Sequence, residues 1–169
     1  MTTSWNRQNY QNEDFEQHPA VKALRRDLAH AIVEVGSFRG EVTVVVAPDR
    51  CVEVLTLLRD DPELVFDFLS DLTAVHWADR EDAPFDVVYH LYSIENKMRF
   101  RIKTRVKDGV EADTAYGVWR TADWLEREVY DMFGIRFAGH PDQRRILNPD
   151  GFEGHPLRKE FPLGGQVRW

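Results

Sequence analysis

Residues 85–106, which read FDVVYHLYSIENKMRFRIKTRV, carry the pattern that decides the fold. In residues 85–94 apolar side chains occupy both faces of an extended run, and in residues 98–106 apolar and basic side chains alternate. The short polar link at residues 95–97 joins the two runs, which predicts a β-hairpin. We expect the basic face of the second strand to meet solvent or a partner, because it carries Arg99, Arg101, Lys103 and Arg105.

The flanking sequence adds further elements on both sides of this hairpin. Helical spacing of apolar residues predicts helices over 19–35, from Pro48 to about residue 60, and over 121–133. A β-branched run predicts a strand over 41–47, and the apolar stretch 64–77 holds a buried strand and a turn. The resulting order, αβαβββα, indicates an α+β fold: a small mixed or antiparallel sheet with helices packed mainly on one face.

The last 36 residues differ from the rest of the chain. Residues 134–169 hold six of the ten glycines and four of the eight prolines, and their apolar residues follow no period. We therefore predict a polar N-terminal lead at 1–17, an α+β domain at 18–133, and a long extended C-terminal arm at 134–169 that binds partner subunits. The alternative is a loop that packs on its own domain.

Composition excludes several classes of protein. The single cysteine, Cys51, allows no internal disulfide and no all-cysteine cluster or zinc site from this chain alone, and it fits a reducing, cytoplasmic setting. A net charge of −7 argues against nucleic-acid binding. The sequence contains neither a run of about 18 apolar residues nor a secretory signal pattern, so we expect no membrane-spanning helix.

The helix predicted over 121–133 shows an unusual distribution of side chains. Its apolar stripe leaves Trp124, Arg127 and Asp131 on the opposite face, with Glu126 and Glu128 on either side of the stripe. A tryptophan opposite a core stripe marks a contact surface, since Trp and Arg are enriched at interface hot spots. The alternative is a surface tryptophan shielded by the C-terminal tail. Arg127 and Asp131 have the i, i+4 spacing of an ion pair.

Two enzymatic interpretations remain open from the residues alone. The acidic residues of this helix could form a carboxylate cluster for acid–base catalysis, but Glu126 and Glu128 diverge by about 200° around the helix axis. A small metal-dependent hydrolase is the second alternative. Its candidate ligands, which lack the spacing of a zinc signature, are His140, Asp142, Glu153 and His155.

One region resembles a known family. Glu126-Arg127-Glu128, then Asp131, two apolar residues, His140, and Arg144 with Ile146 and Leu147 resemble the signature of the 30 kDa-type subunit of respiratory NADH dehydrogenase, complex I. Residues 153–163 resemble its C-terminal arm, and residues 71–75 resemble a further family segment. Gln143, where the family often has an apolar residue, and Glu160-Phe161, where Asp-Tyr is common, are mild departures.

The resemblance implies a structural subunit in the hydrophilic, peripheral arm of the complex. Such a subunit carries no FMN, iron–sulfur cluster or quinone-binding residue, and it catalyses nothing alone. The complex transfers electrons from NADH through FMN and Fe–S centres in partner subunits to quinone, coupled to proton translocation. The implied setting is the cytoplasmic side of the bacterial inner membrane, reached only through the complex. The implied hetero-oligomeric partners are the D-type (49 kDa) subunit, which holds the quinone site, and the B-type subunit, which holds the terminal cluster.

The expected site is therefore a subunit interface, with no catalytic, cofactor-binding or metal-binding residue assigned. Its residues are Trp124, Glu126, Arg127, Glu128, Asp131, His140, Arg144, Arg145, His155, Arg158 and Lys159. We hypothesise that the four Arg and Lys residues from position 144 onward in this set dock the arm on acidic or carbonyl-rich partner surface. Truncation after Gly134 should then leave a folded domain that no longer assembles.

The resemblance also implies a stand-alone subunit rather than the fusion with the 49 kDa-type chain that some bacteria carry. A related membrane-bound hydrogenase or other quinone reductase is the alternative host complex.

Overall fold

A computed structural model of the chain describes residues 15–162 and 164. Within them, a five-stranded mixed sheet has the strand order β1-β2-β5-β4-β3. The strands are β1 (Ile32–Phe38), β2 (Glu41–Val46), β3 (Phe68–His76), β4 (Phe85–Ser93) and β5 (Met98–Val106). The α-helices are α1 (Pro19–Asp27), α2 (Cys51–Asp60) and α3 (Ala122–Phe133), and the 3₁₀ turns are η2 (Phe15–Gln17), η3 (Ala29–Ala31) and η4 (Pro48–Arg50).

The predicted hairpin forms the centre of the sheet. Strands β4 and β5 pair antiparallel in continuous register from Phe85 with Val106 to Ser93 with Met98. Strand β3 extends the sheet antiparallel beyond β4, and β2 pairs parallel to β5 on the other side. The α+β class and the mixed sheet are thus confirmed.

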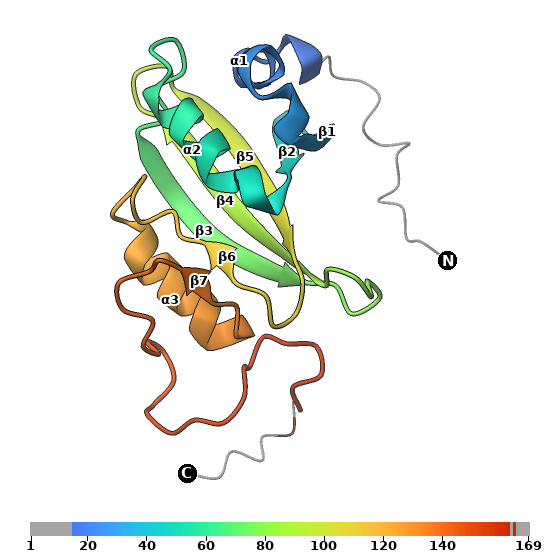
Figure 1. The fold of residues 1–169 in the computed structure, drawn as a ribbon, viewed down its shortest axis with the longest axis vertical. Helices are drawn as coiled ribbons and strands as arrows, with labels where there is room; N and C mark the ends of the chain where they lie inside the picture. Colours follow the sequence, from blue (N-terminus) through green and yellow to red (C-terminus); the bar gives the residue numbers. More distant parts are fainter. Residues whose placement is uncertain (1–14, 163, 165–169) are drawn as a thin grey trace.

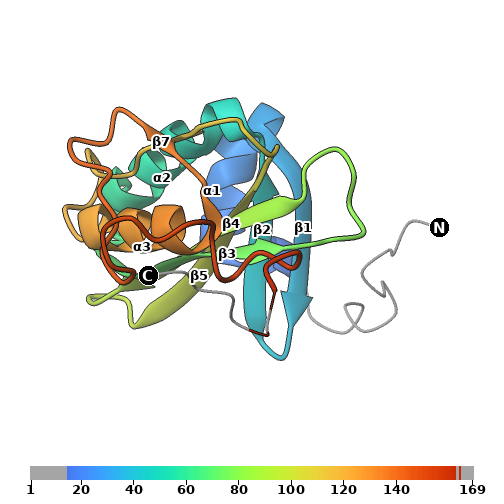
Figure 2. The same cartoon turned by 90° about the horizontal axis from the view of Figure 1, so that it is seen from below.

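The helices cover one face of this sheet, as predicted (Figures 1 and 2). The rings of His18, before α1, and Phe100 stack at 5.0 Å, and those of Phe85 and Phe133 meet edge-on at 6.5 Å. Tyr89 lies fully buried beneath the helices. Free Cys51 at the start of α2 is also buried, and this burial raises the pKa of its thiol to about 12.

The first predicted helix is wrong beyond Asp27. Pro19 opens α1 and the ring Nδ1 of His18 accepts the Ala20 N–H at 3.2 Å, but residues 32–38 form strand β1. Strand β1 pairs with β2 through the two-residue turn Arg39–Gly40, where both residues have positive φ (53° and 81°). Such turns match the twist of a hairpin, and β-branched residues favour a strand once a partner strand is present.

The end of the domain forms a second, two-stranded sheet. Strand β6 (Ala112–Asp113) pairs parallel with β7 (Phe137–Ala138), so the first residues of the predicted arm add to the domain. Residues 139–162 then run back beside α3 (Figure 1). We call them the C-terminal segment. Most of the predicted N-terminal lead (residues 1–14), together with residues 163 and 165–169, falls outside the described residues.

One expectation about the basic face of β5 needs correction. Arg99 is exposed, but Lys103 is only 9% exposed. Burial is the main cause that lowers the pKa of Lys103. Its neighbours on that face are long side chains, and Arg101 and Arg105 reach Glu41 and Glu34 across β2 and β1. The side chains of these ion pairs lie over the sheet beside Lys103, so they partly cover this face of β5.

Candidate functional site on helix α3 and the C-terminal segment

Helix α3 carries a buried carboxylate at Glu126. Its side chain is fully buried and accepts the Thr114 hydroxyl and the Ala115 N–H, both at 2.6 Å. Burial raises the pKa of Glu126 to about 7, while these two hydrogen bonds oppose the increase. The sequence placed Glu126 at one edge of the apolar stripe, but in the structure Glu126 is part of the buried face of α3, because the loop after β6 covers it. Glu128 is exposed.

His140 closes the same buried corner. Its Nδ1 accepts the Asp142 N–H at 3.0 Å, and its Nε2 lies 3.2 Å from the Asp123 carbonyl oxygen. Because Nδ1 accepts, the proton is on Nε2, which donates to that carbonyl. Nε2 also lies 3.8 Å from the Glu126 carboxylate. Both ring nitrogens thus bind backbone groups, one on α3 and one in the turn after β7, and they fix this turn against the helix.

Asp131 is the second buried carboxylate of α3. Its Oδ2 accepts the backbone N–H groups of Ile146, Leu147 and Asn148 at 2.8–3.1 Å. Its Oδ1 accepts from Arg145 at 2.6 Å and from the Asn148 amide at 2.9 Å. Burial raises the pKa of Asp131, but these donors outweigh it and hold the pKa well below its ordinary value.

The predicted Arg127–Asp131 ion pair is therefore wrong. Asp131 faces the C-terminal segment instead of solvent, and Arg127 donates to the carbonyl oxygens of Arg144 and Arg145 at 3.2 and 3.4 Å. Spacing along the helix could not reveal this, because the partners lie 14 to 18 residues away in a segment without periodicity. Together the two side chains bind the backbone of residues 144–148 to α3.

The exposure predicted for Trp124 is confirmed. Its side chain is 61% exposed, and the Arg127 guanidinium lies 5.0 Å from its ring centroid. Leu147, whose N–H is bound by Asp131, is also 61% exposed. Arg144 pairs with Asp142 at 2.7 Å and remains largely exposed. The outer side of α3 and residues 144–147 thus present aromatic, aliphatic and guanidinium groups on a backbone that is internally fixed.

The end of α3 fixes the remainder of the C-terminal segment. Gly134 caps the helix with φ 77°, and the His155 ring packs so closely that an added Cβ would lie 2.6 Å from it. His155 Nδ1 lies 3.0 Å from the Asp131 carbonyl oxygen, and Arg158 donates to the Phe133 carbonyl at 2.6 Å. Arg158 also pairs with Asp108 at 2.7 Å.

The last of the predicted interface residues, Lys159, has an exposed side chain. Its backbone N–H donates to His76 Nδ1 at 3.0 Å. Arg145 and Arg158 were predicted to dock on a partner, but both bind groups of this chain. Sequence reasoning missed Asn148, Asp108 and His76, which hold the C-terminal segment in place. It also missed Thr114, which donates to Glu126.

Three of the four candidate metal ligands have other partners, and the fourth, Glu153, is exposed. His140 and His155 each bind backbone groups of α3, and Asp142 pairs with Arg144. Among the residues that the structure describes, no group of three or more His, Cys, Asp or Glu side chains is arranged to hold a metal ion. The geometry gives the hydrolase alternative no support. The described helices are also too short or too polar to cross a membrane.

These features define a class: an α+β protein in which two buried acidic groups of one helix bind the segments that precede and follow that helix in the same chain. Residues 44–167 match the profile of the family described as respiratory-chain NADH dehydrogenase, 30 Kd subunit. The chain belongs to this family, and the enzyme activity is that of the whole complex.

Individual relatives agree with this assignment. The chain is 49% identical to the C subunit of NADH-quinone oxidoreductase from Geotalea uraniireducens (strain Rf4), over 90% of this chain and 92% of that protein. It is 46% identical to the corresponding C subunit from Geobacter sulfurreducens, over 90% and 94% of the two chains.

Two solved structures share the fold. One is a trypsin-resistant fragment (1–134) of Nqo5, with a TM-score of 0.62 and 30% identity over 72% of this chain and 96% of the fragment. The other comes from the membrane-bound sulfane sulfur reductase, an archaeal respiratory membrane complex. It has a TM-score of 0.70 and 25% identity over 84% of this chain and 82% of that chain.

Proposed function

We propose that this chain is a structural subunit of the peripheral arm of an NADH:quinone oxidoreductase and holds no cofactor of its own. Electrons from NADH would pass through FMN and Fe–S centres of neighbouring subunits to quinone, on the cytoplasmic side of the membrane. The family membership supports the host complex. The buried carboxylates support a structural role, because they form their hydrogen bonds with other groups of this chain.

The proposed interface rests mainly on Trp124, whose exposed ring is covered by the Arg127 guanidinium. Arg127 is held by two backbone carbonyls, so the pair is ordered before any partner binds, and ordered aromatic and arginine groups lose little entropy on association. Leu147 extends the surface. We propose that this surface, with the rest of residues 134–169, contacts the 49 kDa-type subunit of the quinone site and the subunit that holds the terminal cluster.

A Trp124→Ala substitution tests the interface. The chain should fold, because the ring is 61% exposed, while less of the complex should co-purify with an N-terminally tagged chain. A hot-spot tryptophan contributes about 2 kcal/mol or more, which corresponds to at least about a 30-fold loss of affinity. Phe38→Ala is the matched control, since Phe38 is 44% exposed on β1. Full recovery of partner subunits with the Trp124 variant would refute this interface.

The same purification separates the two host complexes. Subunits with NADH:quinone activity support complex I. Hydrogenase or sulfur-reductase subunits support a related membrane complex, which the likeness to the sulfane sulfur reductase chain favours as the second candidate.

A further inference from the structure

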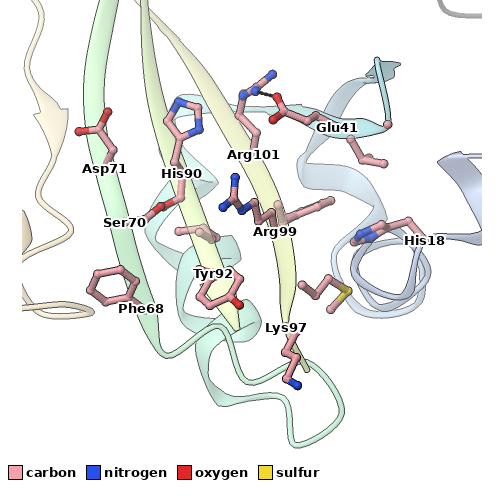
Figure 3. Close-up of a pocket in the computed structure, with 15 residues that line it drawn as sticks. His18, Glu41, Phe68, Ser70, Asp71, His90, Tyr92, Lys97, Arg99 and Arg101 are labelled. Atoms are coloured by element: carbon pink, nitrogen blue, oxygen red, sulfur yellow. Dashed lines mark hydrogen bonds and ion pairs between the residues drawn. The ribbon is translucent and has the colours of Figure 1, made fainter. Parts of the chain in front are cut away.

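The face of the sheet that the helices leave open carries a groove of about 710 Å³ at the end near the β4–β5 turn (Figure 3). It crosses β3, β4 and β5 and reaches the β1–β2 turn and His18, which precedes α1. In the described structure no helix lies over this face. Its polar and aromatic lining residues include Phe68, Asp71, His90, Tyr92, Arg99 and Arg101.

The net charge of the groove is opposite in sign to the net charge of the chain. The lining holds three Lys or Arg residues and two carboxylates, so it is net positive in a protein of net charge −7. Arg101 is paired with Glu41 at the far wall (Figure 3). Lys97 and Arg99 are exposed and form no ion pair with another described residue. Arg99 lies over the Tyr92 ring, 6.0 Å from its centroid.

An aromatic surface lies beside these two cations. Phe68 is the cross-strand partner of Tyr92 and is 44% exposed, whereas most large apolar side chains among the described residues are at least partly buried. Exposed Phe68 and partly buried Tyr92, next to cations without an ion-pair partner among the described residues, offer both an apolar contact and charge-assisted hydrogen bonds. A segment that enters this groove could therefore bury an apolar side chain on Phe68 while its carboxylates reach Lys97 and Arg99.

We propose that this groove docks an acidic polypeptide segment of a partner subunit, with carboxylates that pair with Lys97 and Arg99 and an apolar residue that packs on Phe68 and Tyr92. Charge complementarity favours an acidic segment over nucleic acid, which the strongly negative remainder of the chain would repel. A groove between the β1–β2 turn and β3 suits a polypeptide better than a flat lipid surface. This surface lies on the opposite face of the sheet from helix α3 (Figure 2), so the proposal is independent of the α3 interface.

Site-specific photo-crosslinking in the assembled complex tests the proposal. A benzophenone amino acid at Phe68 should crosslink to a segment of another subunit with at least two Asp or Glu residues close to the crosslinked position, identified by mass spectrometry. The same group at Val33, which is 57% exposed on β1, is the control and should not capture that segment. A segment without carboxylates, a lipid or nucleic-acid adduct, or no crosslink at Phe68 would overturn the proposal.

Charge reversal gives a second readout. The double variant Lys97→Glu with Arg99→Glu should be released from membranes at lower NaCl than the wild type. The control, Lys107→Glu with Arg136→Glu, makes the same change in net charge at exposed positions outside the groove, and Arg136 also lies over a tyrosine, Tyr130, at 5.8 Å. Equal release of wild type and groove variant, or equal shifts for both variants, would refute an acidic occupant.

Discussion

The carboxylate of Asp131 receives five hydrogen bonds, three of them from consecutive backbone N–H groups of residues 146–148. A buried charge is costly unless it is paired and hydrogen-bonded, and here all of the compensation comes from the C-terminal segment. The segment in turn has no regular secondary structure to satisfy its own N–H groups. Each therefore depends on the other, which makes this single side chain the main connection between α3 and residues 144–148.

Asp131→Asn should lower the stability of the chain by about 1.5–3 kcal/mol, the range for hydrogen bonds to a charged group, because its amide NH₂ would face donors. Since the pKa of Asp131 is depressed, its contribution is complete above the unfolded pKa near 3.8 and is lost as pH falls below it. Urea unfolding at several pH values measures both effects. Asp142→Asn, an exposed control, should change little, and a similar loss in both variants would contradict this role.

Glu126 has the opposite pH dependence. Its pKa is about 7 in the folded chain and 4.5 when unfolded, so its stabilisation is complete below pH 4.5 and is lost as pH rises through 7. The slope is at most about 1.4 kcal/mol per pH unit. Glu126→Gln mimics the neutral acid and should remove this dependence, as measured by urea unfolding between pH 4.5 and 8. Unchanged pH dependence in the variant, or its loss in the exposed control Glu128→Gln, would refute the assignment.

The sequence could predict Trp124 at the surface because helical periodicity alone assigns side chains to faces. It could not predict that Asp131 and Glu126 are buried. Their partners, Asn148 and Thr114, come from irregular stretches whose position depends on the tertiary fold. A polar residue on a helix is buried when a later segment covers it, and periodicity contains no information about that segment.

Among the elements, the stability of α3 depends on its C-terminal cap. Gly134 has φ 77°, and a Cβ there would lie 2.6 Å from the His155 ring, so Gly134→Ala should be destabilising by more than the roughly 1–2 kcal/mol of the left-handed conformation alone. Gly151→Ala is the matched control, because Gly151 has φ 84° but open space around it. Thermal unfolding of both variants separates strain from the clash. Equal losses would show that the His155 contact contributes nothing.

Strand β1 shows how a neighbouring element overrides a local pattern. Val21, Leu24, Leu28, Ile32 and Val35 keep helical spacing, yet the helix ends at Asp27. The two-residue turn at Arg39–Gly40 folds residues 32–38 onto β2, and the paired backbone outweighs weak helix propensity in a β-branched stretch. The β4–β5 hairpin was predictable because its alternation and its turn agree.

For the whole molecule, truncation can test whether the domain folds and assembles without the C-terminal segment. Truncation after Gln143 retains β7 and His140, and it should leave a folded domain that no longer joins the complex. The solved structure of a trypsin-resistant fragment of Nqo5 shares the fold of this domain. Circular dichroism of the truncated chain and co-purification with a tag measure the two properties. Normal assembly of the truncated chain would refute the arm as an interface.

The parallel pairing of β2 with β5 constrains the order in which the strands can pair while the chain is being synthesised. Strand β2 is complete at Val46, but its partner in the middle of the sheet is not complete until Val106. During synthesis the β1–β2 hairpin therefore emerges with an open, valine-rich edge that waits for about 60 further residues, and such long-range pairing is slow and open to aggregation. We expect nascent chains that stop before β5 to need chaperone protection, and release of β5 from the ribosome to be the step that commits the domain to its fold.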